Sequence, residues 1–155
     1  MEEEQVVRAY ADMVYRIAFR YTGSRTDADD VFSETFLAYF RKKRSFESEE
    51  HRKAWLIRVA INCAKDLIRG RLAYTELDPG LVSDGHDADN TELRLDLRQA
   101  IDQLPKEYRE VICLFYLEQL SVHEIAQVLG RNENTVKVQL SRARTKLRAF
   151  LGEQE

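Results

Sequence analysis

Residues 121–150, S-V-H-E-I-A-Q-V-L-G-R-N-E-N-T-V-K-V-Q-L-S-R-A-R-T-K-L-R-A-F, decide how the chain folds. Ser121 is followed three residues later by Glu124, a capping-box pattern that predicts the start of a short helix. Gly130 is expected to end this helix, and Asn132 is expected to cap a second one. The stretch therefore predicts two helices joined by a tight turn.

The second predicted helix has two different faces. Its apolar residues recur at steps of three and four, which places them in one stripe: Val136, Leu140, Ala143, Leu147 and Phe150. The other faces carry our candidates for contacting DNA, namely Asn134, Thr135, Lys137, Val138, Gln139, Ser141, Arg142 and Arg144. Val138 points away from the stripe, where a thymine methyl group would suit it. A DNA-binding helix-turn-helix is one interpretation, and an ordinary hairpin of surface helices is the other.

The composition fits a globular protein made of helices. Of the 155 residues, 33% are charged and 44% are hydrophobic, and two are prolines. Apolar residues recur at helical spacing almost throughout, so we expect an all-α protein. No apolar run approaches the roughly 18 residues that a membrane span needs. The acidic start, M-E-E-E-Q, does not look like a signal peptide, so we expect a cytoplasmic protein without membrane insertion.

The sequence offers little to build a catalytic or metal site. Cys63 and Cys113 lie in apolar helical patterns and are expected to be buried thiols in a reducing compartment. No pair of cysteines or histidines has zinc-ligand spacing, so no metal or cofactor is expected. We can assemble no carboxylate pair, nucleophile–base set or glycine-rich phosphate loop. An enzyme is therefore the least favoured class.

Charge alternates along the chain. The net charge of −3 divides into −4 over residues 1–40, +6 over 41–71, −7 over 72–120 and +2 over 121–155. Because nucleic acid responds to local potential, the two basic blocks are compatible with DNA binding despite the acidic total.

The N-terminal part predicts two helices. The first includes Tyr10 to Tyr21 and ends at T-G-S, and Thr26 or Asp27 is expected to cap the second, which runs to about residue 41. We expect its core face to consist of Phe32, Phe36, Tyr39 and Phe40. On the opposite side of the wheel lie Asp27, Asp30, Glu34 and Leu37. This strip could dock a basic partner helix, although acids early in a helix also simply suit its dipole.

A third predicted helix carries a polar stripe formed by Arg58, Asn62, Lys65 and Arg69. A basic loop with one aromatic residue, Phe46, precedes it. Cationic side chains could hold phosphates, Asn62 could contact a base edge, and Phe46 could stack on an unpaired base. A solvated surface stripe is the alternative.

Between residues 70 and 90 the apolar periodicity lapses, and this stretch contains both kinds of helix breaker, namely Pro79 and the glycines at 80 and 85. We expect a helical domain at 1–71, an acidic flexible linker at 72–92 and a second helical domain at 93–155. Pro105 is expected to start a helix rich in bulky residues under the helix-turn-helix. Each half is small, so motion between the halves is expected.

Three motifs follow one another along the chain. They are T-G-S-R-T-D-A-D-D-V-F-S-E-T-F at 22–36, K-A-W-L-I-R-V-A-I-N-C-A-K-D-L-I-R at 53–69, and L-P-K-E-Y-R-E-V at 104–111 continuing through S-V-H-E-I-A-Q-V-L-G and T-V-K-V-Q-L-S-R-A-R. In this order they resemble the sigma-70 family of bacterial RNA polymerase sigma factors, in the extracytoplasmic-function group. Members keep only the second and fourth conserved regions.

The resemblance implies roles for particular positions. Asp29, Asp30 and Glu34 lie where the family docks on the clamp helices of the polymerase β′ subunit, and the β subunit is a further expected partner. The loop 42–51 and Asn62 lie where the family captures a base flipped from the melted −10 element, a step that costs a few kcal/mol. Residues 137, 138, 141 and 142 lie where it reads the −35 element. The family also implies an anti-sigma factor.

The chain departs from the family pattern at two places. Ser33 replaces a frequent glutamine before Glu-Thr-Phe, which could alter binding to core polymerase. Val138 and Gln139 replace a frequent Ser-Arg pair. The DNA sequence of the −35 element that this protein recognises therefore cannot be inferred from the elements that its relatives recognise. The alternative function is a helix-turn-helix repressor whose N-terminal half senses a ligand or dimerises.

Overall fold

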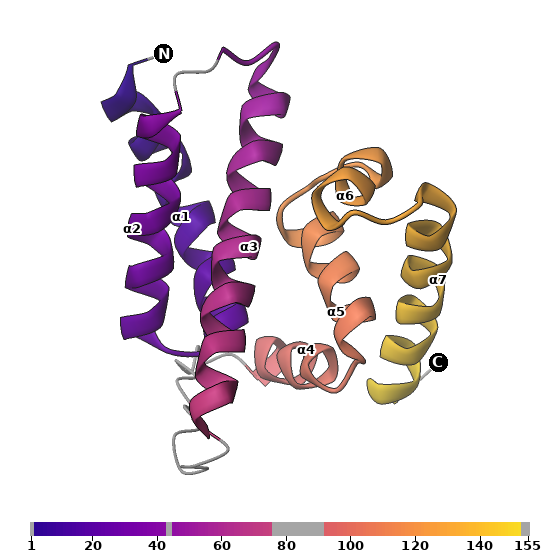
Figure 1. Ribbon diagram of the computed structural model, residues 1–155. Coiled ribbons are helices and arrows are strands. Elements are labelled where there is room, and N and C mark those ends of the chain that lie inside the picture. The colour runs from indigo at the N-terminus through magenta and orange to yellow at the C-terminus, as the bar shows by residue number, and fades with distance from the viewer. Residues whose placement is uncertain (1, 43–44, 76–91, 153–155) are drawn as a thin grey trace. The chain divides into compact units, whose positions relative to one another are not determined.

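A computed structural model describes residues 2–42, 45–75 and 92–152, and every element in these ranges is a helix (Figure 1). The prediction of an all-α protein is therefore confirmed. The chain divides into two compact units, Met1–His86 and Asp87–Glu155. No helix in the described ranges is both long and apolar enough to span a bilayer.

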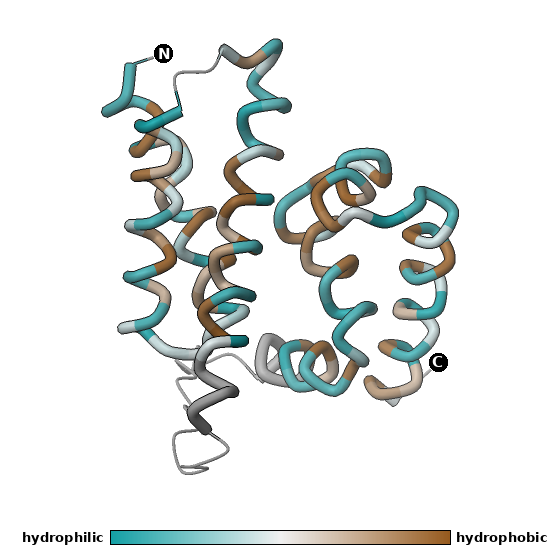
Figure 2. Tube along the Cα trace, viewed as in Figure 1, coloured by the Kyte–Doolittle hydropathy of each residue, from teal (hydrophilic) through white to brown (hydrophobic). Residues whose placement is uncertain are grey.

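The first unit, unit 1, consists of three helices that pack on one another: α1 (Glu3–Thr22), α2 (Arg25–Arg41) and α3 (Glu49–Thr75). Hydrophobic and hydrophilic segments alternate along them, as in amphipathic helices (Figure 2). The core includes Ile17, Leu56 and Ile61, each at most 1% exposed. Burying each such side chain contributes about 1.5–3 kcal/mol before entropy is counted.

The turn between α1 and α2 corrects one prediction. Gly23 has a φ of 70° and ends α1, donating its backbone N–H to the Phe19 carbonyl at 2.7 Å. Ser24, rather than Thr26 or Asp27, caps α2, because its Oγ accepts the Asp27 N–H at 3.3 Å. The helix thus starts earlier than expected. Asp27 lies within the first turn of α2 and is only 5% exposed.

The core face of α2 is also rotated from the predicted one. Phe36 is buried as expected, but Phe32, Tyr39 and Phe40 are only half-buried. Apart from Asp27, the other buried positions of α2 are small or β-branched: Ala28, Val31 and Thr35. Close approach of three helices favours small side chains at their centre, where Ala18, Ala28 and Ala64 lie in one buried cluster.

Helix α3 continues to Thr75, so residues 72–75 of the predicted linker are helical. Gly70 does not end the helix. A single glycine costs a helix interior only about 1 kcal/mol, which flanking helix formers can offset. The rest of the predicted linker, residues 76–91, lies outside the described residues, and residue 92 begins the next helix.

The second unit, unit 2, consists of α4 (Glu92–Asp102), α5 (Lys106–Ile112), η1 (Cys113–Leu117), α6 (Val122–Leu129) and α7 (Glu133–Phe150). Pro105 precedes α5 as predicted, and η1 continues α5 as one turn of π-helix. α7 packs on α5 and α6.

The caps predicted for the helix-turn-helix are confirmed. Ser121 accepts the Glu124 N–H at 3.1 Å, and Glu124 accepts the Ser121 N–H at 2.8 Å. Gly130 ends α6 with a φ of 69°, a conformation that glycine adopts without strain. The Asn132 side chain accepts the Asn134 N–H at 2.8 Å at the start of α7. Two helices joined by a glycine turn therefore form as expected.

Candidate nucleic-acid and protein interfaces

Helix α7 presents a continuous exposed face. Val136, Leu140 and Ala143 are at most 2% exposed and anchor the opposite side in the core of unit 2. Six of the predicted DNA-contacting residues are exposed: Asn134, Thr135, Lys137, Val138, Ser141 and Arg142. The apolar side chain of Val138 is 46% exposed to water. An apolar side chain within an otherwise polar face is typical of a surface that contacts a binding partner.

The two remaining predicted residues of α7, Gln139 and Arg144, are half-buried and held by neighbours. The Arg144 Nε donates to the Tyr116 hydroxyl at 2.7 Å, and its guanidinium lies 5.6 Å from the Tyr116 ring centre. The same group lies 5.7 Å from the ring of Phe115. Arg144 therefore braces η1 against α7, a contact between distant residues that helical spacing could not reveal.

Gln139 belongs to a polar cluster that sequence reasoning missed. Its Oε1 accepts from the Arg131 Nη1 at 3.0 Å, and the same nitrogen donates to the Glu107 carbonyl at 3.3 Å. The other terminal nitrogen of Arg131 forms an ion pair with Glu110. Little in the sequence indicates this cluster, because Glu110 lies within the run of bulky residues after Pro105 that predicts a buried core helix.

Helix α2 carries the predicted acidic strip, with one change. Asp29, Asp30 and Glu34 are exposed, and Leu37 is 43% exposed beside them. Asp27, which the helical wheel placed on the same side, is buried and does not belong to the surface. The exposed set combines three carboxylates with one apolar side chain, a combination suited to a basic amphipathic helix.

Helix α3 presents the predicted polar stripe. Arg58, Asn62 and Arg69 are exposed, whereas Lys65 is half-buried with its Nζ 5.8 Å from the Tyr21 ring centre. Arg69 pairs with Asp66 at 2.8 Å on the surface. Exposed pairs of this kind are worth at most about 1 kcal/mol, so Asp66 holds Arg69 only weakly.

Phe46 is half-buried in an aromatic cluster rather than presented alone. Its ring stacks on Tyr39 with centroids 5.8 Å apart and planes 4° apart, and it contacts Trp55 edge-on at 5.9 Å. The Arg52 guanidinium lies 5.2 Å from its ring centre. These contacts hold the loop before α3 in place. Residues 43–44 of the predicted basic loop lie outside the described residues.

Polar contacts brace the start of α3. The Tyr10 hydroxyl and an Arg52 terminal nitrogen both bind the Glu49 carboxylate, and the Arg52 Nε donates to the Tyr39 hydroxyl at 3.0 Å. Burial, followed by the hydrogen bond and negative charge of Glu49, raises the pKa of Tyr10 to about 12. The phenol is thus a stable donor at neutral pH, and it links α1 to α3.

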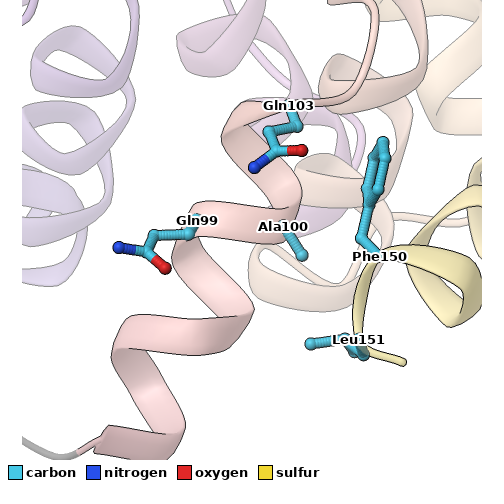
Figure 3. Close-up of a pocket in the computed structure, with 5 residues that line it drawn as sticks. All are labelled: Gln99, Ala100, Gln103, Phe150 and Leu151. Carbon is cyan, nitrogen blue, oxygen red and sulfur yellow. The ribbon is translucent and has the colours of Figure 1, made fainter. Parts of the chain in front are cut away.

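The remaining candidates offer no competing site. Cys113 is buried and Cys63 half-buried, and burial raises the pKa of the Cys63 thiol. A pocket of about 250 Å³ in unit 2 is lined by Gln99, Ala100, Gln103, Phe150 and Leu151 (Figure 3), and none of these was predicted to bind DNA or protein. Among the described residues, no three metal-binding side chains gather around one point.

Comparison with known proteins matches both units. Residues 6–72 match the family described as Sigma-70 region 2, and residues 94–147 match Sigma-70, region 4. The chain is 34% identical to the ECF RNA polymerase sigma factor SigE of Mycolicibacterium smegmatis, over 96% of this chain and 61% of that protein. It is 31% identical to the ECF RNA polymerase sigma factor SigW of Bacillus subtilis, over 94% of this chain and 87% of that protein.

Solved structures show the same fold. The sigma factor RpoE from Bartonella quintana, solved with the anti-sigma factor NepR, has a TM-score of 0.81 at 25% identity, covering 98% of both chains. CnrH, solved with the cytosolic domain of CnrY, has a TM-score of 0.69 at 29% identity, covering 99% of this chain and 89% of the other.

Proposed function

The chain belongs to the sigma-70 family of RNA polymerase sigma factors, in the extracytoplasmic-function group. From this membership we propose which of its surfaces bind core RNA polymerase, the −10 element and the −35 element in transcription initiation. Sigma factors are non-catalytic regulators that act by binding. Three surfaces carry the proposal: the acidic strip of α2, the polar stripe of α3 and the exposed face of α7. The observation that carries it furthest is the α7 face, which has six exposed candidate residues on a helix anchored by the buried side chains of Val136, Leu140 and Ala143.

The acidic strip of α2, formed by Asp29, Asp30, Glu34 and Leu37, binds core RNA polymerase in this proposal. Its carboxylates would face basic side chains of the β′ clamp helices, and Leu37 would enter an apolar contact between them. Charged groups around an apolar centre give orientation and fast association. The β subunit is a further partner, for which we assign no residues.

In this proposal the polar stripe of α3 binds the −10 element. The stripe is formed by Arg58, Asn62, Lys65 and Arg69. Arginine and lysine would hold the backbone of the melted strand, and Asn62 would contact a base that has left the stack. Phe46 contributes indirectly here, because its ring is already stacked on Tyr39 and supports the loop beside the stripe.

The exposed face of α7 takes the −35 element in the major groove. Asn134, Thr135, Lys137, Val138, Ser141 and Arg142 would contact DNA directly, as the second helix of a helix-turn-helix does. Arg144 is held against Tyr116 and would reach at most the backbone at the edge of the interface.

A repressor with a helix-turn-helix is the less favoured alternative. Such a protein would need only the second unit to resemble a sigma factor, yet residues 6–72 match Sigma-70 region 2 as well. We further propose that the protein acts in the cytoplasm and is held inactive by an anti-sigma factor, as relatives solved in complexes suggest.

Substitution in the acidic strip tests the proposed polymerase contact. We expect Glu34→Lys to abolish capture of core RNA polymerase by the tagged protein, because it reverses one charge in the centre of the strip. Glu3→Lys is the matched control, since Glu3 is an exposed acid of α1 outside the strip. Equal capture by both variants, with unchanged circular dichroism, would place the polymerase contact elsewhere.

A further inference from the structure

Arg131 lies in the turn between α6 and α7, and its side chain connects α5 to α7. Its guanidinium pairs with Glu110 of α5, donates to the Glu107 carbonyl at 3.3 Å and donates to Gln139 of α7 at 3.0 Å. The side chain of Arg131 is 18% exposed and that of Glu110 only 5%. The guanidinium is therefore fixed by several bonds away from bulk water, where charge-assisted hydrogen bonds are strong.

The chemistry of arginine decides which way the Gln139 amide points. A guanidinium has only donors, so the amide atom that faces it must be the oxygen. The nitrogen of the amide, with its two N–H donors, is then left to bind other groups. Gln139 follows Val138 in sequence and lies one turn from the exposed Thr135 and Arg142, so this nitrogen borders the proposed DNA-binding face.

We propose that Gln139 is a specificity-determining residue that contacts DNA through its amide N–H donors, and that Arg131 is the positioning residue that turns the amide oxygen toward itself. This inference rests on the proposed function, in which α7 enters the major groove at the −35 element. A free glutamine reads adenine with its oxygen and nitrogen together. Because the oxygen is oriented toward Arg131, the amide offers its N–H donors to DNA, and Gln139 selects a base that presents acceptors. Guanine, with N7 and O6 in the major groove, is the best match.

The buried Glu110–Arg131 pair explains how the orientation is kept. Removing one partner of a buried pair leaves an uncompensated charge, whereas replacing both with apolar residues of similar volume is often tolerated. Arg131 therefore cannot release Gln139 cheaply by turning toward another partner. The same property supplies a usable variant, Glu110→Leu combined with Arg131→Met, which removes both charges and leaves the net charge unchanged.

The test is a selection of DNA duplexes randomised across the −35 element, bound by the full chain in complex with core RNA polymerase and read by sequencing. We expect the wild type to prefer guanine over adenine at one position by about 5- to 150-fold, the range for one good base contact. Gln139→Ala should lose this preference at that position alone. The Glu110→Leu/Arg131→Met variant should reduce it to within about twofold, because the freed amide can then read adenine, and in the Gln139→Ala background it should change nothing further.

The outcomes separate this inference from the function on which it rests. If the double variant weakens binding equally on all sequences while guanine stays preferred, Arg131 is merely structural and the inference is wrong. A guanine preference that survives Gln139→Ala would also overturn it, with the −35 role of α7 intact. If the wild-type complex shows no base preference anywhere in the −35 element, both the inference and the proposed role of α7 fail. Circular dichroism melting of each variant confirms that the protein is folded.

Discussion

Val138 is the residue of α7 whose exposure most needs a partner. In the proposed complex its methyl groups meet the methyl group of a thymine, which is the only apolar group on a base edge in the major groove. We predict that replacing this thymine by uracil weakens binding of the wild-type holoenzyme by about 0.8 kcal/mol, the value of one buried methyl group.

A variant separates this contact from general effects of uracil. Val138→Ala should bind thymine and uracil duplexes with nearly equal affinity, as measured by competition between the two duplexes. If uracil weakens the binding affinity of the wild type and of Val138→Ala equally, or changes neither affinity at any −35 position, Val138 does not contact a thymine methyl group.

Arg142 is exposed on the same face of α7 as Val138. We predict that Arg142→Ala weakens binding to the preferred −35 element by about 1–3 kcal/mol and relaxes the base preference at one position. Arg148→Ala, an exposed position near the end of α7, is the control for loss of one positive charge. A uniform loss on every sequence would show that Arg142 contacts a phosphate instead.

Side-chain contacts limit what the sequence can predict at this scale. Spacing along α7 correctly predicted that Val136, Leu140 and Ala143 are buried and that Val138 is exposed, whereas the predicted stripe opens at its end, where Leu147 is half-buried and Phe150 is 43% exposed. It could not predict the state of Gln139 or Arg144, because their partners lie in the turn before α7 and in η1. Asp27 shows the same limit, since it was expected on the face of Asp30 and Glu34 and is buried instead.

At the scale of elements, helix caps are the most predictable features. The capping box of α6 depends on Ser121 and Glu124, and both of its hydrogen bonds are present. We predict that Ser121→Ala lowers the free energy of unfolding of unit 2 by about 1 kcal/mol, because an N-cap side chain satisfies a backbone donor that otherwise has no partner in the helix.

The measurement is urea unfolding of the full chain followed by circular dichroism. Trp55, the chain's single tryptophan, lies in α3 and reports unit 1 by fluorescence. Ser141→Ala, an exposed position inside α7, should change stability by less than about 0.5 kcal/mol. A Ser121→Ala variant as stable as Ser141→Ala would mean that the capping box contributes little.

Other elements show where local patterns fail. The run after Pro105 was expected to be one helix, and its last five residues form the π-helix η1 instead. A π-turn inserts one extra residue into the helical ladder, and its cause is tertiary packing rather than propensity. Likewise α3 passes through Gly70, because the residues on either side still favour a helix.

At the scale of the whole molecule, the alternation of charge along the chain follows the two units. The basic block at 41–71 includes most of α3, and the basic block at 121–155 includes α7, so each proposed DNA-binding helix lies in its own positive segment. The acidic blocks include α2 with its proposed polymerase contact. The order of motifs was sufficient to identify both units, since each depends on local capping and periodicity. The roles of individual surface residues depend on the partner molecules that they contact. The sequence of this protein alone does not contain that information.

Run-off transcription with core RNA polymerase tests the central claim most directly. We predict that the protein, added to core enzyme and a library of genomic fragments, gives discrete transcripts. The DNA upstream of their start sites should share one pair of −35 and −10 elements. Glu34→Lys should lose these transcripts and Glu3→Lys should keep them. Tight sequence-specific binding to duplex DNA without polymerase, together with no promoter-dependent transcript from any fragment, would contradict the account and favour a repressor.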